Sequence, residues 1–304
     1  MANFGTMTRM SSFSALPGAV VRAVSFLRQN VMAAMIVAIL PGLAAVFLTY
    51  ETGLVTSEAM APDWTRYLIA LVFWYFAMVM SQAAMFRLSL RGKPEGFFGL
   101  AVGGDELRLA ASWALVFFLI LVAAGIGLVI YAALMAAVSM VSMDTAGLTP
   151  ENPVETGNIP DLAAYYGPVE WSIAIILGAF ALVMLAGYAG RLLLAPAASM
   201  ARRKVQALSV MAMTRKRGFA VALGCVLVFV PAGLLVHGFG VLSERLADVP
   251  VHQPARLFSD NGLVAGLPLY AVLAFLHGWL AAFLTLPVFA GLTTALYRAW
   301  GGDD

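Results

Sequence analysis

Long apolar runs separated by short polar stretches are the main pattern along this chain. An α-helix rises about 1.5 Å per residue, so about 20 consecutive apolar residues reach across the hydrocarbon core of a bilayer. Transmembrane helices are therefore predicted at residues 30–50, 65–87, 112–140, 170–195, 219–242 and 262–286. The expected fold class is all-α, a polytopic membrane helical bundle of about six spans, in which each helix satisfies its own backbone.

Around these spans the chain divides into three parts. Residues 1–29 form an amphipathic N-terminal segment, residues 30–300 the membrane domain and residues 301–304 a short tail. Pro17 suits the first turn of a helix over 17–28, which would lie at the membrane surface with Val20, Val21, Val24 and Leu27 on its apolar face. The run at 30–50 is read as a retained span, because no clear small-residue cleavage site follows it before Tyr50.

Prolines inside the runs mark candidate hinges at Pro41, Pro231 and Pro287. The last apolar run continues to Trp300, which is too long for one upright helix. A kink or break is therefore expected at Pro287, which lacks a backbone donor and crowds the preceding turn. The run at 112–140 is also long, and we expect it to begin as a shallow helix near 105–111, with Asp105 as the N-cap.

Composition excludes a soluble fold. Hydrophobic residues make up 62% of the chain and charged residues only 11%, against about 45–50% and about 25% in soluble domains. The single cysteine, Cys225, excludes an internal disulfide framework and is expected to be a small buried hydrophobe. Arginine outnumbers lysine by 15 to 3, a bias typical of a bacterium with a GC-rich genome.

The loops differ in charge, and this difference predicts the orientation. One set of loops holds 14 of the 18 basic residues: Arg9, Arg22, Arg28, Arg87, Arg91, Lys93, Arg108, Arg202, Arg203, Lys204, Arg215, Lys216, Arg217 and Arg298. Because Lys and Arg gather in cytoplasmic loops, this set is predicted to face the cytoplasm of a bacterial inner membrane, with both termini. The proline-containing loop at 143–168 is then external, as a solvated connector or, alternatively, a lid or binding loop.

Residues 198–217 carry the densest positive charge. Ala201, Val205, Leu208 and Ala212 recur at helical spacing. Six basic residues flank them: Arg202, Arg203, Lys204, Arg215, Lys216 and Arg217. This pattern favours a helix lying on the membrane surface against anionic headgroups, where each basic residue contributes about 1 kcal/mol. The alternative is a short elbow that only follows the charge bias of inner loops.

Few polar groups fall within the predicted spans. Arg191 lies near the inner boundary, about 30 Å from Trp171 at 1.5 Å per residue, where it either snorkels or contacts an anion or lipid phosphate. His277, His237 and Gln82 are intramembrane polar candidates, with Gln82 expected to bond between helices. No Asp or Glu falls within a predicted core, which argues against a proton-coupled carrier.

Reactive motifs are missing from the chain: there is no phosphate-binding loop of the Walker type, no GxSxG and no HExxH. We therefore expect no catalysis, cofactor, metal or nucleic-acid partner. Small residues four apart, Ala123 with Gly127 and Ala186 with Gly190, would permit close helix packing.

The stretch from Gly190 to Gly224 reads GRLLLAPAASMARRKVQALSVMAMTRKRGFAVALG. Arg191, Pro196, the Ala-Leu-Ser at 207–209 and the Thr-Arg at 214–215 stand in an order that resembles the six-span glycerophosphoryl diester phosphodiesterase membrane domain-like proteins. The ending, with Pro287 and Tyr297-Arg298, is similar too. The catalytic domain that names this family has no counterpart here, so the resemblance implies a membrane fold and no phosphodiesterase activity.

Two functions are consistent with these observations. The first is a non-catalytic scaffold or accessory protein that binds anionic lipids, protein partners or a second copy of itself, which the basic inner segments favour. The alternative is a channel or carrier for a small solute or lipid, which the proline-interrupted spans favour. A polar cavity reaching mid-membrane would distinguish the carrier, and a tightly packed bundle the scaffold.

Overall fold

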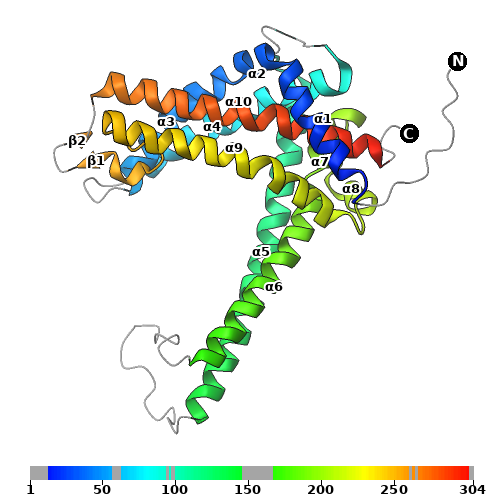
Figure 1. The fold of residues 1–304 in the computed structure, drawn as a ribbon, viewed down its shortest axis with the longest axis vertical. Coiled ribbons are helices and arrows are strands. Elements are labelled where there is room, and N and C mark those ends of the chain that lie inside the picture. The colour runs from blue at the N-terminus through cyan, green and yellow to red at the C-terminus, as the bar shows by residue number, and fades with distance from the viewer. Residues whose placement is uncertain are drawn as a thin grey trace, which may run out of the picture.

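The computed structural model describes residues 13–56, 63–93, 96, 100–145, 167–259, 262–263 and 266–300 (Figure 1). The helices run as α1 (Leu16–Gln29), α2 (Val31–Val37), α3 (Ile39–Thr56), α4 (Trp64–Arg91), α5 (Gly104–Thr145), α6 (Pro168–Leu192), α7 (Ala195–Arg202), α8 (Ala207–Met213), α9 (Gly218–Ala247) and α10 (Leu267–Ala299). A short 3-10 helix, η2 (Pro254–Arg256), precedes the antiparallel pair β1 (Phe258–Ser259) and β2 (Gly262–Leu263).

Within these residues, six helical segments are long and apolar enough to cross a membrane, which confirms the all-α, multi-pass fold class. They span Val31–Thr56, Trp64–Arg91, Gly104–Val141, Pro168–Arg202, Gly218–Ala247 and Leu267–Ala299. Most of the predicted external connector, at 146–166, and the tail at 301–304 lie outside the described residues.

The first span is interrupted at Ala38, where α2 ends and α3 begins. The cause is Pro41, which has no backbone N–H to donate to the carbonyl of Val37 four residues earlier. The Ser81 hydroxyl of α4 donates to that carbonyl at 2.9 Å. A side chain on a neighbouring helix thus satisfies the group that the proline leaves without an intrahelical donor, as lipid-embedded backbone requires.

The prolines inside the last two spans do not end their helices, and the predicted N-cap at Asp105 is wrong. α10 runs without a break from Leu267 to Ala299 with Pro287 inside it, and α9 likewise contains Pro231. α5 is one helix from Gly104, with Asp105 in its first turn and not at the N-cap. Leu286 and Val288, on both sides of Pro287, are buried.

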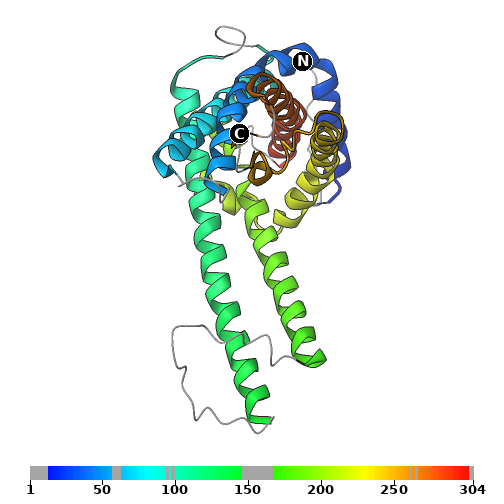
Figure 2. The ribbon, with the colours of Figure 1, turned by 90° about the vertical axis from the view of Figure 1, so that its left-hand side faces the viewer.

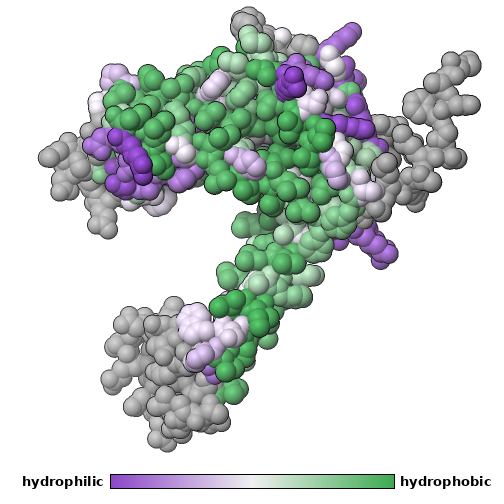
Figure 3. All heavy atoms as spheres, in the orientation of Figure 1, coloured by the Kyte–Doolittle hydropathy of each residue, from purple (hydrophilic) through white to green (hydrophobic). Residues whose placement is uncertain are grey.

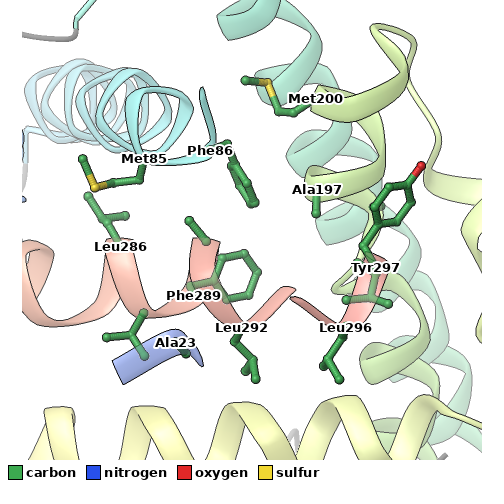
Figure 4. Packing of buried hydrophobic residues seen from close by; sticks show 14 of the residues in the cluster. Ala23, Met85, Phe86, Ala197, Met200, Leu286, Phe289, Leu292, Leu296 and Tyr297 are labelled. Atoms are coloured by element: carbon green, nitrogen blue, oxygen red, sulfur yellow. The ribbon is translucent and has the colours of Figure 1, made fainter. Parts of the chain in front are cut away.

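α10 forms the centre of the bundle and packs against α1, α3, α4 and α9. Figure 4 shows Leu286, Phe289, Leu292 and Leu296 of α10 pointing into the space between these neighbours. The Phe289 ring meets three other aromatic rings, of Phe86, Trp113 and Phe229, at centroid distances of 6.2, 5.6 and 5.8 Å. Large side chains from four helices therefore fill the middle of the bundle.

α5 and α6 form a hairpin that leaves this bundle and projects away from it, steeply inclined to α9 and α10 (Figures 1 and 2). α5 has 42 residues, so at 1.5 Å per residue it is about 60 Å long, twice the thickness of a bilayer core. Figure 3 shows hydrophobic residues over the bundle between two polar ends, and along the hairpin too.

At the root of the hairpin, α6 approaches α9 closely through glycines. A Cβ added at Gly190 would run into the carbonyl oxygen of Gly218, and one added at Gly218 into that of Gly187. Gly190 takes part in close helix packing, as predicted. The second residue of α6 at this contact is Gly187, because the predicted Ala186 is exposed. The other predicted pair is wrong, since a Cβ at Gly127 would meet nothing within 4 Å.

Candidate functional site

The basic segment at 198–217 is two short helices joined by a turn, and not one helix on the membrane surface. Residues Ala195 to Met200 of α7 are all buried, against α5 and α4. Arg203 takes a left-handed backbone conformation (φ 52°) and ends α7. The chain turns there and re-enters a helix at Ala207, so the segment is anchored in the bundle by one half and exposed by the other.

Hydrogen bonds hold this turn in place. The Ser199 hydroxyl donates to Ser112 of α5 at 3.2 Å and accepts from the backbone N–H of Gln206 at 2.9 Å. Both serines are fully buried. One hydroxyl therefore links α5, α7 and the start of α8.

The exposed half, residues 201–217, is called the basic elbow below. Its basic side chains Arg202, Arg203, Lys204, Arg215 and Lys216 are exposed. Between them stand two exposed apolar residues, Val205 at 44% and Leu208 at 62%. Cations beside exposed aliphatic groups are the pattern of a surface that meets headgroups and the adjoining acyl chains.

Arg191 does not point to a free surface. Its Nη2 donates to the carbonyl of Met211, in the last turn of α8, at 2.8 Å. In return the Thr214 hydroxyl donates to the Arg191 carbonyl at 3.0 Å. Arg191 therefore closes α8 onto the end of α6, and neither the snorkelling nor the lipid-phosphate interpretation describes this contact.

Two further basic side chains tie the elbow to the end of α10. Arg202 Nε donates to the Tyr297 hydroxyl at 3.1 Å, and the Arg217 guanidinium lies 4.9 Å from the centre of the Trp300 ring. Such a cation–π contact contributes about 0.5–1 kcal/mol at an exposed site. Arg203, Lys204, Arg215 and Lys216 are thus the members of the elbow that point away from the protein.

α1 begins with Pro17 in its first turn, as predicted, but buries a different face. Leu16, Ala19 and Ala23 pack inward, whereas Val21 and Val24 of the predicted apolar face are exposed. Gly291 of α10 allows this, because a Cβ there would lie only 3.0 Å from the Ala23 Cα. α1 is therefore a packed element of the bundle that also presents Arg22 and Arg28 outward.

Carboxylates in the first turn of α5 form ion pairs that the sequence analysis did not predict. Glu106 pairs with Arg87, which is only 1% exposed, and Asp105 accepts from Arg91 at 2.8 Å and from Arg108 at 3.0 Å. These pairs join the end of α4 to the first turn of α5. The available signal was the opposite charge at the two ends of one short connection, residues 92–103.

At the other end of the bundle, Glu51 in α3 is buried and pairs with Arg66 of α4 at 2.8 Å. The span was expected to stop one residue earlier, at Tyr50, but α3 continues to Thr56. Burial within the protein favours charges that are paired, so Glu51 and Glu106 each act first as structural ion partners.

The remaining polar candidates lie apart from the elbow. Gln82 accepts from the indole Nε1 of Trp113, which joins α4 to α5. His237 lies with its ring 5.2 Å from that of His252, and His277 stacks on Phe239 at 6.3 Å. No group of three or more His, Cys, Asp or Glu in the described residues is placed to hold a metal ion.

Fold and site together define a multi-pass membrane protein with six spans and a basic elbow. No protein-family model, no curated protein and no solved structure matches this chain. The resemblance to the phosphodiesterase membrane domain-like proteins thus stays a prediction.

Proposed function

We propose that this chain is a non-catalytic scaffold of a bacterial inner membrane, whose basic elbow faces the cytoplasm and binds anionic phospholipid. One observation carries the proposal: Arg203, Lys204, Arg215 and Lys216 point outward beside the exposed Leu208, on a segment that α7 anchors in the bundle. Each outward cation near an anionic surface contributes about 1 kcal/mol. Protein partners or a second copy would dock from the same side.

The packed centre of the bundle supports a scaffold over a carrier. Phe86, Trp113, Phe229 and Phe289 fill the middle, and both buried carboxylates are engaged with arginines. A carrier needs polar groups that release one partner to take up another. Turnover of a phosphodiester or lipid substrate by the purified protein would contradict the non-catalytic part of the proposal.

The lipid part is tested by neutralising Arg203, Lys204 and Arg215 to Gln together. In nanodiscs of mixed phosphatidylglycerol and phosphatidylcholine, the wild type should enrich the anionic lipid, and the variant should lose about 3 kcal/mol of that preference at low salt. The control neutralises Arg245 to Gln, an exposed arginine at the opposite end of the bundle that forms no ion pair with any described residue. Equal loss from both variants would contradict a specific role of the elbow.

The orientation is tested by cysteine labelling in intact cells. Cys225 is buried, so Cys225→Ala provides a silent background for single cysteines. Lys204→Cys should resist a membrane-impermeant maleimide until the cells are lysed, whereas Asp248→Cys should react at once. The reverse pattern would place the elbow outside the cytoplasm.

A further inference from the structure

A second, separate basic site lies where α1, α4 and α10 meet. It is a cavity of about 300 Å³ whose lining residues are Arg22, Ser25, Phe26, Gln29, Ser89, Gly291, Thr294, Ala295 and Arg298. This volume is at the lower end of the range for small-ligand sites, about 300–1,000 Å³. None of the sequence patterns pointed to it, because its three walls come from the two ends of the chain and the second span.

The lining has the chemistry of an anion site. It contains two guanidinium groups, three hydroxyls and one amide, and no carboxylate. Arg298 donates to the carbonyl of Leu90 at 3.0 Å through one Nη, which orients the group and leaves its other donors available. Arg22 is exposed and forms no hydrogen bond or ion pair with any described residue. Planar guanidinium groups match phosphate oxygens in geometry as well as charge.

A buried hydroxyl without a partner marks the same cavity independently. Thr294 is only 2% exposed, and its Oγ1 forms no hydrogen bond with the described residues. Its neighbour Thr293, equally buried, satisfies its hydroxyl on the carbonyl of Phe289 at 2.7 Å. A buried polar group left without a partner costs about 1–3 kcal/mol. A ligand oxygen that accepts a hydrogen bond from Thr294 Oγ1 would remove this cost.

The depth of the cavity fits the headgroup layer. About 20 residues of helix cross the hydrocarbon core. Counted from the first residue of each helix, the core ends near Pro287 in α10 and near Ala84 in α4. Thr294, Arg298 and Ser89 all lie beyond these points. Small side chains along α1 and Gly291 keep α1 close to α10, as the position of Ala23 in Figure 4 illustrates, so the two arginines flank one opening.

We infer that this cavity binds one phosphate group, with the Arg22 and Arg298 guanidinium groups as charge partners and Thr294 Oγ1 as the buried donor. The phosphate belongs either to a phospholipid headgroup or to free inorganic phosphate. The inference does not depend on the basic elbow or on which side of the membrane this end faces.

The experiment uses the full chain in mild detergent, delipidated and then titrated in two arms. One arm follows phosphatidic acid by native mass spectrometry, and the other follows inorganic phosphate by calorimetry. Arg298→Gln and Arg22→Gln should each weaken binding about tenfold or more, and Thr294→Val about threefold to tenfold. Arg28→Gln, on the same helix outside the lining, and Thr293→Val, with a satisfied hydroxyl, should change it less than twofold.

Binding in the lipid arm alone identifies a headgroup site, and binding of inorganic phosphate alone a soluble-anion site. No saturable binding in either arm overturns the inference. The inference is also overturned if Arg28→Gln weakens binding as much as Arg22→Gln does, because diffuse surface charge would then account for the loss of affinity. Thr294→Val keeps the shape of the side chain, so it remains informative even if an arginine variant is unstable. Neutralising Arg203, Lys204 and Arg215 should leave the binding of inorganic phosphate in the calorimetric arm unchanged, which separates the cavity from the basic elbow.

Discussion

The bundle of α3, α4, α9 and α10 and the α5–α6 hairpin are both built from helices apolar enough to cross a membrane, yet they are packed in opposite ways. In the most apolar stretch of α4, 44% of the residues are buried inside the protein, against 6% in α5. The bundle buries aromatic rings, ion pairs and glycines against protein. Beyond its root, the hairpin exposes most of its large apolar side chains, including Leu121, Leu128 and Ile130, and buries few, such as Met135 and Ala174.

The difference shows that hydrophobicity alone does not determine which helices pack. In lipid there is no hydrophobic gain from burying Leu against Leu, so association depends on close fit and polar bonds. The root of the hairpin has both: Glu106 and Gln82 join α4 to α5, and Gly190 meets Gly218. Beyond this root, one link is the Tyr131 hydroxyl, which donates to the Ala174 carbonyl at 3.4 Å.

Breaking the ionic bond at the hairpin root should have the largest effect. Glu106→Ala leaves the buried Arg87 without this carboxylate, and we expect a loss of about 3–5 kcal/mol in the free energy of unfolding. Reversible unfolding in mixed micelles measures it. The double variant Arg87→Met/Glu106→Met should recover most of the loss, because buried apolar side chains replace the charges. A Glu106→Ala protein as stable as the wild type would show that the pair does not hold the root.

Truncating matched leucines should separate the two regions most directly. Leu292 is 0% exposed in the core and Leu128 is 67% exposed on the hairpin. Leu292→Ala should cost about 2–5 kcal/mol, since it opens a cavity among packed side chains. Leu128→Ala should cost about 0.5 kcal/mol or less, because lipid fills the vacated space. The same unfolding measurement applies, and equal losses would mean that protein also covers the outer face of the hairpin.

A smaller effect is expected from adding one methyl group to each of two glycines. Gly190→Ala forces the new Cβ against the Gly218 carbonyl, so α6 and α9 must separate at a cost of about 1–3 kcal/mol. Gly127→Ala meets open space and should be neutral or up to about 1 kcal/mol more stable, through its higher helix propensity. Thermal unfolding followed by tryptophan fluorescence compares them. A destabilised Gly127→Ala would argue that another helix contacts this face.

The number and type of the elements were predictable because they depend on local sequence. Each span is a contiguous apolar run, and Pro17, Pro41 and the charges between runs mark local events. The ends of the spans were less predictable. Glu51 was placed outside the first span because a charge ends an apolar run, whereas in the fold Arg66 offsets that charge. Glu106 fell within the helix expected near 105–111, but its partner Arg87 was not predictable.

The candidate sites divide in the same way. The exposed cations of the basic elbow were predictable from their spacing, but the burial of α7 was not, since it depends on α5 and α4 lying against it. The role of Arg191 was missed for the same reason, because its partner is a carbonyl 20 residues later in the chain. Nothing near Thr294 in sequence indicates that it lines a cavity together with Arg22.

The sequence by itself determined that this protein is a six-span helical membrane protein with one strongly basic side, because helix length, apolar runs and loop charge are properties of neighbouring residues. The tertiary structure alone decided which glycines touch, which carboxylate meets which arginine, and where α1, α4 and α10 leave a cavity. Those outcomes require surfaces from distant parts of the chain to fit at atomic distance, and a one-dimensional pattern does not encode that fit residue by residue.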